Sequence, residues 1–206
     1  MTSKKDYLSR IYELETIDET LALYSEWAKT YTEDVTASGY VTPKRCADAL
    51  ACHTSDLAIP VLDVGCGTGI SGTALRDAGF SDISGTDVNA EMLAEAKRLG
   101  IYRTQWLSDL DNPFPFEPGT YGAISAIGVV GIGAAPLSFL HAFLEKLGPG
   151  GLTTFSFNDH TLKKPEFDNA VADLVDSGAF TLLHKEYGPH LTGKNIKATV
   201  YVLRKT

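Results

Sequence analysis

The stretch that decides the fold is residues 59–79, IPVLDVGCGTGISGTALRDAG. An apolar run ends at Val64 and passes directly into three alternate glycines, Gly65, Gly67 and Gly69, before a segment with helical spacing. Glycine lets the backbone turn tightly there and approach a ligand without an intervening side chain. The pattern therefore predicts a strand, a ligand-binding turn and a helix, the first unit of an α/β fold.

Strands and helices alternate along the rest of the chain, which predicts a doubly wound α/β fold with a mostly parallel sheet and helices on both faces. The last two strands have no helix between them, so we expect that pair to be antiparallel. Residues 112–119 contain three prolines, and regular structure is not expected there. The predicted strands are 59–64, 83–86, 102–107, 121–130, 152–157, 180–187 and 196–204, and the predicted helices are 70–78, 90–99, 136–147 and 166–177.

Two helices are predicted ahead of the glycine-rich turn. Residues 17–31 place apolar and aromatic side chains on one helical face. A second helix is expected to run to about His53, with Thr42 as its N-cap and Pro43 as its first residue. We expect one domain over 1–206, with an N-terminal helical cap over 1–57 and a core over 58–206.

Charge and composition narrow the expected partners. The chain has 206 residues, with 18 Lys and Arg against 26 Asp and Glu, a net charge of −8. Because nucleic-acid affinity comes largely from cations that neutralise phosphates, we expect no nucleic-acid partner, and we expect a small molecule or a local site on a protein. No apolar stretch approaches a membrane span and the N-terminus has no signal-peptide core, so we expect a cytoplasmic protein without a membrane partner. No Cys and His cluster has zinc spacing, so no metal is expected, and the sequence does not indicate an oligomeric state.

Two acidic residues frame the glycines. Asp87 follows Gly69 by 18 residues, at the end of the next predicted strand, where a carboxylate accepts hydrogen bonds from ribose hydroxyls. Asp63 precedes the first glycine by two residues, and its charge would repel a pyrophosphate but favour a ligand with an ammonium and a sulfonium. The alternatives are a solvated strand-end carboxylate for Asp87 and a loop-capping carboxylate for Asp63. Gly67, Gly69 and Gly72 also satisfy the dinucleotide pattern G-x-G-x-x-G, so a nicotinamide enzyme is a second interpretation.

The segment VLDVGCGTG at 61–69, followed by Asp87, closely resembles the class I S-adenosylmethionine-dependent methyltransferases. Within them, ALYSEWAKTYTEDV at 22–35, GYVTP at 39–43 and VLDVGCGTGISGTALRDAGF at 61–80 resemble the Williams-Beuren-region methyltransferase-like group. The resemblance covers roughly residues 20–204. It implies a seven-stranded sheet with an antiparallel last strand, S-adenosylmethionine as cofactor, S-adenosylhomocysteine as product, and methyl transfer as the reaction.

The resemblance also implies a cofactor site. An aromatic pair on the N-terminal helix would fold over the cofactor, although a core-facing stripe is the alternative for that pair. An acidic residue would meet the adenine amino group, with a plain loop carboxylate as the alternative. The implied cofactor residues are Gly65, Cys66, Gly67 and Gly69 at the methionine part, Asp63 near its amino group, Asp87 at the ribose, Val88, Met92, Asp109 and Leu110 around the adenine, Ile127 beside the cofactor, and the aromatic pair Trp27 and Tyr31.

The catalytic side chain is not identified by the sequence. Many members of this family carry a histidine after the fourth strand, where this chain has Gly131-Ile132-Gly133, and acidic residues where it has Thr32 and Gly122. Methyl transfer from a sulfonium is an in-line displacement, so a general base is needed only where the nucleophile holds a proton that must leave.

Candidates for contact with the substrate follow the fifth strand or lie in the N-terminal cap. His160 is the candidate base, with a solvated loop histidine as the alternative, and His184 and His190 are weaker candidates. Asn158 and Tyr40 are candidate substrate contacts, with packing as the alternative for Tyr40. The run 128–135 would line one wall, which suggests a modest, rather apolar acceptor.

We therefore expect a methyltransferase that acts on a small molecule. The alternatives are an NAD-dependent oxidoreductase, a non-catalytic S-adenosylmethionine-binding protein and a methyltransferase with a protein acceptor.

Overall fold

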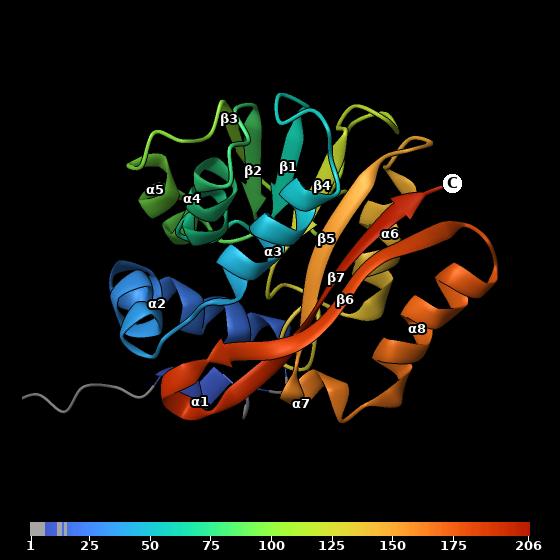
Figure 1. The fold of residues 1–206 in the computed structure, drawn as a ribbon. Helices are drawn as coiled ribbons and strands as arrows, with labels where there is room; N and C mark the ends of the chain where they lie inside the picture. Colours follow the sequence, from blue (N-terminus) through green and yellow to red (C-terminus); the bar gives the residue numbers. More distant parts are fainter. Residues whose placement is uncertain (1–6, 12–13, 15) are drawn as a thin grey trace, which may run out of the picture.

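The computed structural model describes residues 7–11, 14 and 16–206. The strands form one seven-stranded sheet in the order β3-β2-β1-β4-β5-β7-β6 (Figure 1). This is the α/β doubly wound architecture that the alternation of strands and helices predicts. The strands are β1 (Val61–Val64), β2 (Ile83–Asp87), β3 (Thr104–Leu107), β4 (Ala123–Ala126), β5 (Leu152–Asn158), β6 (Phe180–Leu191) and β7 (Ile196–Lys205).

The sheet is parallel from β3 to β5 and antiparallel at one edge. β7 lies between β5 and β6 and runs antiparallel to both, so the predicted antiparallel pair is confirmed. The carboxyl ends of β1, β2, β4 and β5 consequently share one edge of the sheet, where ligands bind in folds of this class.

Helices cover both faces of the sheet and that edge. The cluster over β1, β4 and β5 on one face includes side chains of α6 and α8, and the cluster on the other face includes side chains of α3 and α4. In Figure 1, α2 lies across the end of the sheet toward which β1 points. The helices are α1 (Tyr7–Arg10), α2 (Ile17–Ala37), α3 (Thr42–Cys52), α4 (Ile70–Asp77), α5 (Ala90–Lys97), α6 (Leu137–Glu145), α7 (Asp159–Leu162) and α8 (Pro165–Asp176), with a 3₁₀ turn at Thr192–Lys194.

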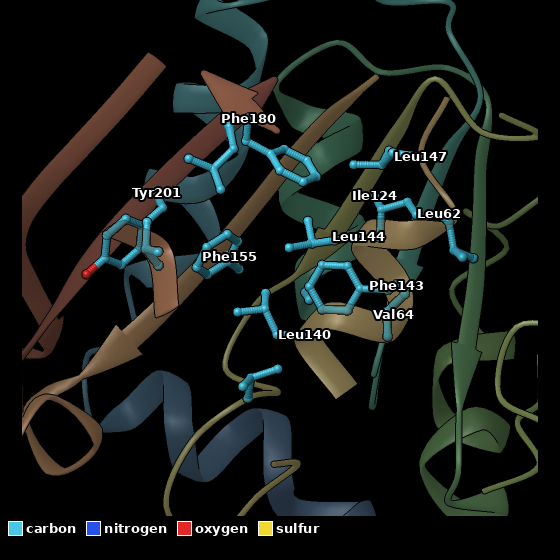
Figure 2. Close-up of a cluster of buried hydrophobic side chains, with 14 of the residues drawn as sticks. Leu62, Val64, Ile124, Leu140, Phe143, Leu144, Leu147, Phe155, Phe180 and Tyr201 are labelled. Atoms are coloured by element: carbon cyan, nitrogen blue, oxygen red, sulfur yellow. The ribbon is translucent and has the colours of Figure 1, made fainter. Parts of the chain in front are cut away.

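The larger hydrophobic cluster anchors the strands that carry the site. Leu62 of β1 and Ile124 of β4 pack with α6, and Phe155 of β5 stacks on Tyr201 of β7 (Figure 2). Full burial of such side chains contributes about 1.5–3 kcal/mol each. The proline-containing segment 112–119 has no helix or strand, as predicted, and its Phe114 packs into the same cluster.

Four differences from the predicted elements bear on the site. β4 ends at Ala126 instead of 130, because the glycine-containing run after it leaves the strand conformation, with Gly128 at φ +72°. Helix α2 continues to Ala37, β6 continues to Leu191, and the short helix α7 follows β5 directly. These changes bring three additional segments to the ligand-binding edge of the sheet.

The predicted N-cap of α3 is wrong. Val41 is the N-cap and Thr42 is already helical, with Pro43 next to it. The Thr42 hydroxyl is 2.8 Å from Nδ1 of His190 instead of bonding to the backbone of its own helix. Thr42 therefore links α3 to β6.

Candidate active site

The glycine turn and Asp87 form one hydrogen-bonded unit. The Asp87 carboxylate accepts the Gly67 N–H at 2.8 Å on one oxygen and the Asn89 N–H at 2.8 Å on the other. Burial raises the pKa of Asp87, and these backbone N–H groups oppose the rise. A carboxylate has about four lone-pair sites, so this half-buried group keeps acceptor capacity for ribose hydroxyls. A Cβ on Gly67 would meet no atom within 4 Å, so the space beside the turn is open to a ligand.

Asp63 is buried beneath this turn. Both of its hydroxyl donors, Ser71 Oγ at 2.6 Å and Tyr102 Oη at 2.7 Å, bond to the same oxygen, Oδ2. The other oxygen, Oδ1, has no hydrogen-bond partner among the described residues. Burial raises the pKa of Asp63 to about 6, and the two hydroxyls partly offset that rise. An under-solvated carboxylate at this position favours a cationic ligand over a pyrophosphate.

Tyr102 is a site residue that the sequence did not indicate. Its ring fills the space beside two glycines: a Cβ on Gly72 would lie 2.2 Å from its hydroxyl oxygen, and a Cβ on Gly85 would lie 2.9 Å from its ring. The third glycine of the G-x-G-x-x-G pattern therefore makes room for a tyrosine that holds Asp63. The position of Tyr102 beside Asp63 depends on the pairing of β2 with β3, and the spacing of residues in the sequence does not reveal that pairing.

Helix α2 is tied to the cofactor end by side-chain hydrogen bonds. The hydroxyls of Thr32 and Thr68 are 2.8 Å apart, which joins α2 to the glycine turn. Nearer the start of α2, the Leu21 carbonyl and Ser25 Oγ accept hydrogen bonds from the Asn89 side chain at 3.1 Å and 2.9 Å. Thr32, where the family usually has an acidic residue, therefore contacts the turn directly.

The predicted aromatic pair lies on this helix. Trp27 is 1% exposed and donates its Nε1–H to Asp34 at 2.9 Å, and Tyr31 contacts it edge-on at 4.7 Å between ring centroids. Both residues line a cavity at this edge of the sheet, together with Tyr24. Packing within an aromatic cluster and contact with a ligand are both compatible with this placement, so their role stays a prediction.

The predicted adenine side is more open. Met92 is buried at the start of α5, whereas Asp109 is exposed and its Oδ1 accepts the Asp111 N–H at 2.9 Å. Leu110 is exposed, Val88 is half-buried and Cys66 and Ile127 are buried. Val88 follows Asp87 directly, and the Met92 N–H donates to Asn89 Oδ1 at 3.0 Å. The cofactor contacts of all these residues stay predictions.

A shallow cavity of about 80 Å³, partly open to solvent, lies at the ends of β4, β5 and β6. We call it the acceptor cavity. Two of the predicted substrate contacts, Tyr40 and Asn158, line it, whereas His160 does not. The histidine that does line it is His190, which the sequence analysis ranked below His160. The lining residues are Leu8, Ile11, Tyr24, Trp27, Tyr31, Val35, Tyr40, Gly128, Ile132, Gly133, Ala134, Asn158, His190 and Leu191.

Known proteins resemble this chain in sequence or in fold. A methyltransferase domain family matches residues 61–151. Methyltransferase-like protein 27 of Homo sapiens is 32% identical over 166 residues, which cover 77% of this chain and 66% of that protein. The 18S rRNA (guanine-N(7))-methyltransferase of Bos taurus is 40% identical over 81 residues, which cover 39% of this chain and 28% of that protein. Among solved structures, a SAM-dependent methyltransferase of Methanosarcina mazei superposes with a TM-score of 0.60 at 13% identity, covering 76% of this chain and 96% of that one.

The chain belongs to the class I S-adenosylmethionine-dependent methyltransferases, and its cofactor is S-adenosylmethionine. The site fits that cofactor, because Asp87 retains acceptors for a ribose and the turn is open at Gly67. The chain spans about two thirds of the length of the human relative and under a third of the bovine one.

The expectation that nucleic acid is excluded as a partner is wrong. Relatives from Bos taurus, Dictyostelium discoideum and Saccharomyces cerevisiae are 18S rRNA methyltransferases or a probable one. The inference failed because net charge sums over the whole surface, whereas a base taken out of its stack is recognised by contacts within a local pocket. In the described part of the chain, no helix has the length and apolar character of a bilayer crossing.

Proposed function

We propose that this enzyme methylates a small molecule whose flat, uncharged body enters the acceptor cavity. The observation that carries the proposal is the kind of side chain that lines the acceptor cavity. Three tyrosines and several aliphatic side chains surround the cavity, and among the described residues no Lys, Arg, Asp or Glu lines it. A cavity of this kind desolvates an apolar group favourably and offers a charged one no compensating partner.

The loop after β4 forms the wall that faces the aromatic cluster. A Cβ on Gly128 would lie 2.8 Å from the Tyr40 hydroxyl oxygen, so the absence of a side chain lets Tyr40 close over this loop. Bound S-adenosylmethionine supplies a methyl group that is already activated by its sulfonium. The contribution of the chain is then to orient the acceptor in line with that group and to exclude water.

The experiment is a methyl-transfer assay with labelled S-adenosylmethionine and matched acceptors: thiophenol, phenol and aniline, their carboxylated analogues, and an 18S rRNA transcript. We expect transfer to one or more neutral aromatic acceptors and less transfer to the charged analogues. Tyr40→Ala should lower kcat/KM about tenfold, as expected for loss of 1–2 kcal/mol of contact. Its cofactor Kd should stay within about twofold of wild type, and Tyr187→Ala, an exposed tyrosine outside the cavity, is the matched control.

A base of an RNA is the second candidate acceptor, and the rRNA methyltransferases among the relatives favour it. An unstacked base is also flat and enters pockets lined by aromatic side chains. Transfer to the rRNA transcript alone would replace the small-molecule proposal with this one. Intact cofactor binding without transfer to any acceptor would refute both.

A further inference from the structure

The acceptor cavity has a polar end. A second, smaller hollow of about 30 Å³ adjoins it and shares Gly128, Ile132, Ala134, Asn158 and His190 with it. The remaining lining of the second hollow includes Ser156 and Thr161. His190 and Asn158 therefore lie where the aromatic part of the cavity meets a polar part, the position at which the polar group of an otherwise apolar acceptor would be recognised.

A β-bulge turns His190 toward this junction. Pro189 pairs with Lys197 and Leu191 pairs with Ile196, so His190 is the extra residue between two paired positions. Bulges of this kind redirect a side chain and are frequent next to active sites.

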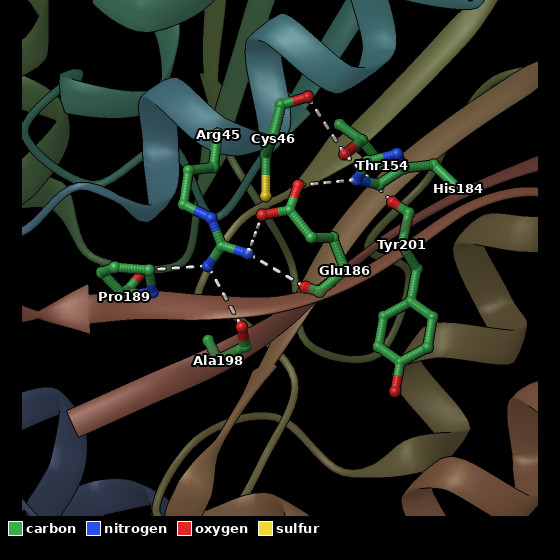
Figure 3. A network of polar contacts seen from close by, with 8 residues as sticks. All are labelled: Arg45, Cys46, Thr154, His184, Glu186, Pro189, Ala198 and Tyr201. Atoms are coloured by element: carbon green, nitrogen blue, oxygen red, sulfur yellow. Dashed lines mark hydrogen bonds and ion pairs between the residues drawn. The ribbon is translucent and has the colours of Figure 1, made fainter.

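Arg45 of α3 holds the bulged backbone in place (Figure 3). Its guanidinium donates to the carbonyl oxygens of Pro189 at 2.8 Å, Ala198 at 3.1 Å and Glu186 at 2.9 Å. Because these carbonyls lie on both strands of the β6–β7 pair, the direction of the His190 side chain is set by the fold rather than by a ligand.

The hydrogen bond with Thr42 determines which ring nitrogen of His190 carries the proton. Both side chains are buried, and the Thr42 hydroxyl has one described partner, His190 Nδ1 at 2.8 Å. Because a buried hydroxyl without an acceptor is destabilising, the Thr42 hydroxyl donates to Nδ1, and a neutral ring then has its proton on Nε2. Burial lowers the pKa of His190 to about 4, with Arg45 and His160 lowering it further and Asp159 opposing them, so the ring is neutral near pH 7.

Asn158 adds a second donor beside it. Its Oδ1 accepts the Thr161 N–H at 3.0 Å and caps α7, which leaves the amide NH₂ as the end available to a ligand. The Tyr40 ring contacts the His190 ring edge-on, with 5.1 Å between centroids, and closes the aromatic side of the junction.

We propose that His190 is a specificity-determining residue that donates its Nε2–H to an oxygen atom of the methyl acceptor, with the Asn158 amide as the second donor. The proposal rests on the proposed function, because it uses the same cavity. It narrows the acceptor to flat, apolar molecules that carry a hydrogen-bond-accepting oxygen, such as an aryl ketone or a methoxyarene with a nucleophilic group.

The first test measures the His190 ring directly by two-bond ¹H–¹⁵N correlation spectra of the full chain saturated with S-adenosylhomocysteine. We expect a neutral ring with its proton on Nε2 at pH 7, and a shift of the Nε2 signal when acetophenone is added. Thr42→Val removes the hydroxyl but keeps the ring, and should move population to the Nδ1–H form. A proton on Nδ1 or a charged ring in wild type would overturn the proposal.

The second test compares acetophenone with cumene, which has a similar shape but no oxygen. His190→Phe should weaken acetophenone binding at least fivefold, the loss of about one hydrogen bond, and leave cumene binding unchanged. His190→Gln should restore part of the affinity, and His184→Gln, on the same strand but outside the cavity, should have no effect. Equal losses for the two probes would overturn the proposal by showing that His190 acts through shape.

The two tests separate this proposal from the proposed function. If neither probe binds wild type, the acceptor cavity is not the binding site for such molecules and the proposed function fails with the donor role. If cumene and acetophenone bind equally well to wild type and to His190→Phe, the cavity stands as the site and only the role of His190 falls.

Discussion

The two ends of the site are built in different ways. At the cofactor end, the glycine turn, Asp63, Asp87 and Tyr102 all fall within residues 61–102, and their contacts join two carboxylates to hydroxyl and backbone N–H groups. At the acceptor end, Tyr40, Gly128, Asn158 and His190 come from four distant segments and meet only in the folded sheet. The comparison shows why the cofactor is evident from this chain and the acceptor is not.

The largest expected effect is the loss of stability when the Arg45 hydrogen bonds behind the acceptor end are removed. Arg45→Leu removes three hydrogen bonds to backbone carbonyls of β6 and β7. Hydrogen bonds to charged groups contribute about 1.5–3 kcal/mol each, so with three of them we expect a loss of about 5 kcal/mol in the free energy of unfolding, measured in urea. Arg76→Leu is the control, since its ion pair with Asp77 is exposed and should change stability by under about 0.5 kcal/mol. An equally small change in stability for Arg45→Leu would mean that the β-bulge is stable without the Arg45 hydrogen bonds.

The next effect is a pH dependence that belongs to the cofactor end. The pKa of Asp63 is about 6 when folded and 3.8 ordinarily, so the folded state binds more protons between these values. Its contribution to stability is present below about pH 4 and is lost as pH rises through about 6, with a limit of about 3 kcal/mol. Asp63→Asn should therefore reduce the pH dependence of the free energy of unfolding between pH 4 and 7, whereas Asp77→Asn, at an exposed position, serves as the control and should keep the wild-type pH dependence. The same slope in both variants would place the titrating group elsewhere.

A smaller effect concerns the ribose carboxylate. Asp87→Ala should weaken S-adenosylmethionine binding at least tenfold, because it removes an acceptor for the cofactor and leaves the Gly67 N–H without its partner. Titration calorimetry measures the change, with NAD as a ligand control and Asp77→Ala, at an exposed position outside the cofactor site, as the comparison. Unaltered cofactor affinity in Asp87→Ala, or binding of NAD by wild type, would contradict the geometry assigned to the glycine turn.

The smallest effect tests the link between the two ends. Thr32→Val removes the hydrogen bond that joins α2 to the glycine turn, and should weaken cofactor binding about threefold, as for one neutral hydrogen bond. Thr30→Val, an exposed position on the same helix, is the control. If both variants bind equally well, α2 is positioned by its aromatic packing alone.

Local patterns were enough to predict most of the fold and the place of the glycine turn between β1 and α4. The Asn89 cap of α5, the glycine turn and the unpaired proline segment all depend on residues within a few positions of one another. The N-cap of α3 was mispredicted because Thr42 bonds to His190, 148 residues away, and no local pattern shows that partner. The position of His190 at the acceptor cavity, where His160 is absent, also has no local signal, since a bulge and an arginine from another element orient His190.

The sequence by itself determined the class of this protein, because the apolar run, the alternate glycines and the spaced carboxylates act over short distances along the chain. Only the tertiary structure decided that Gly72 accommodates Tyr102, that Thr32 reaches the glycine turn, and that His190 lines the acceptor cavity. The physical reason is that these contacts join residues far apart in the sequence, and their geometry exists only once strand register and helix packing are set.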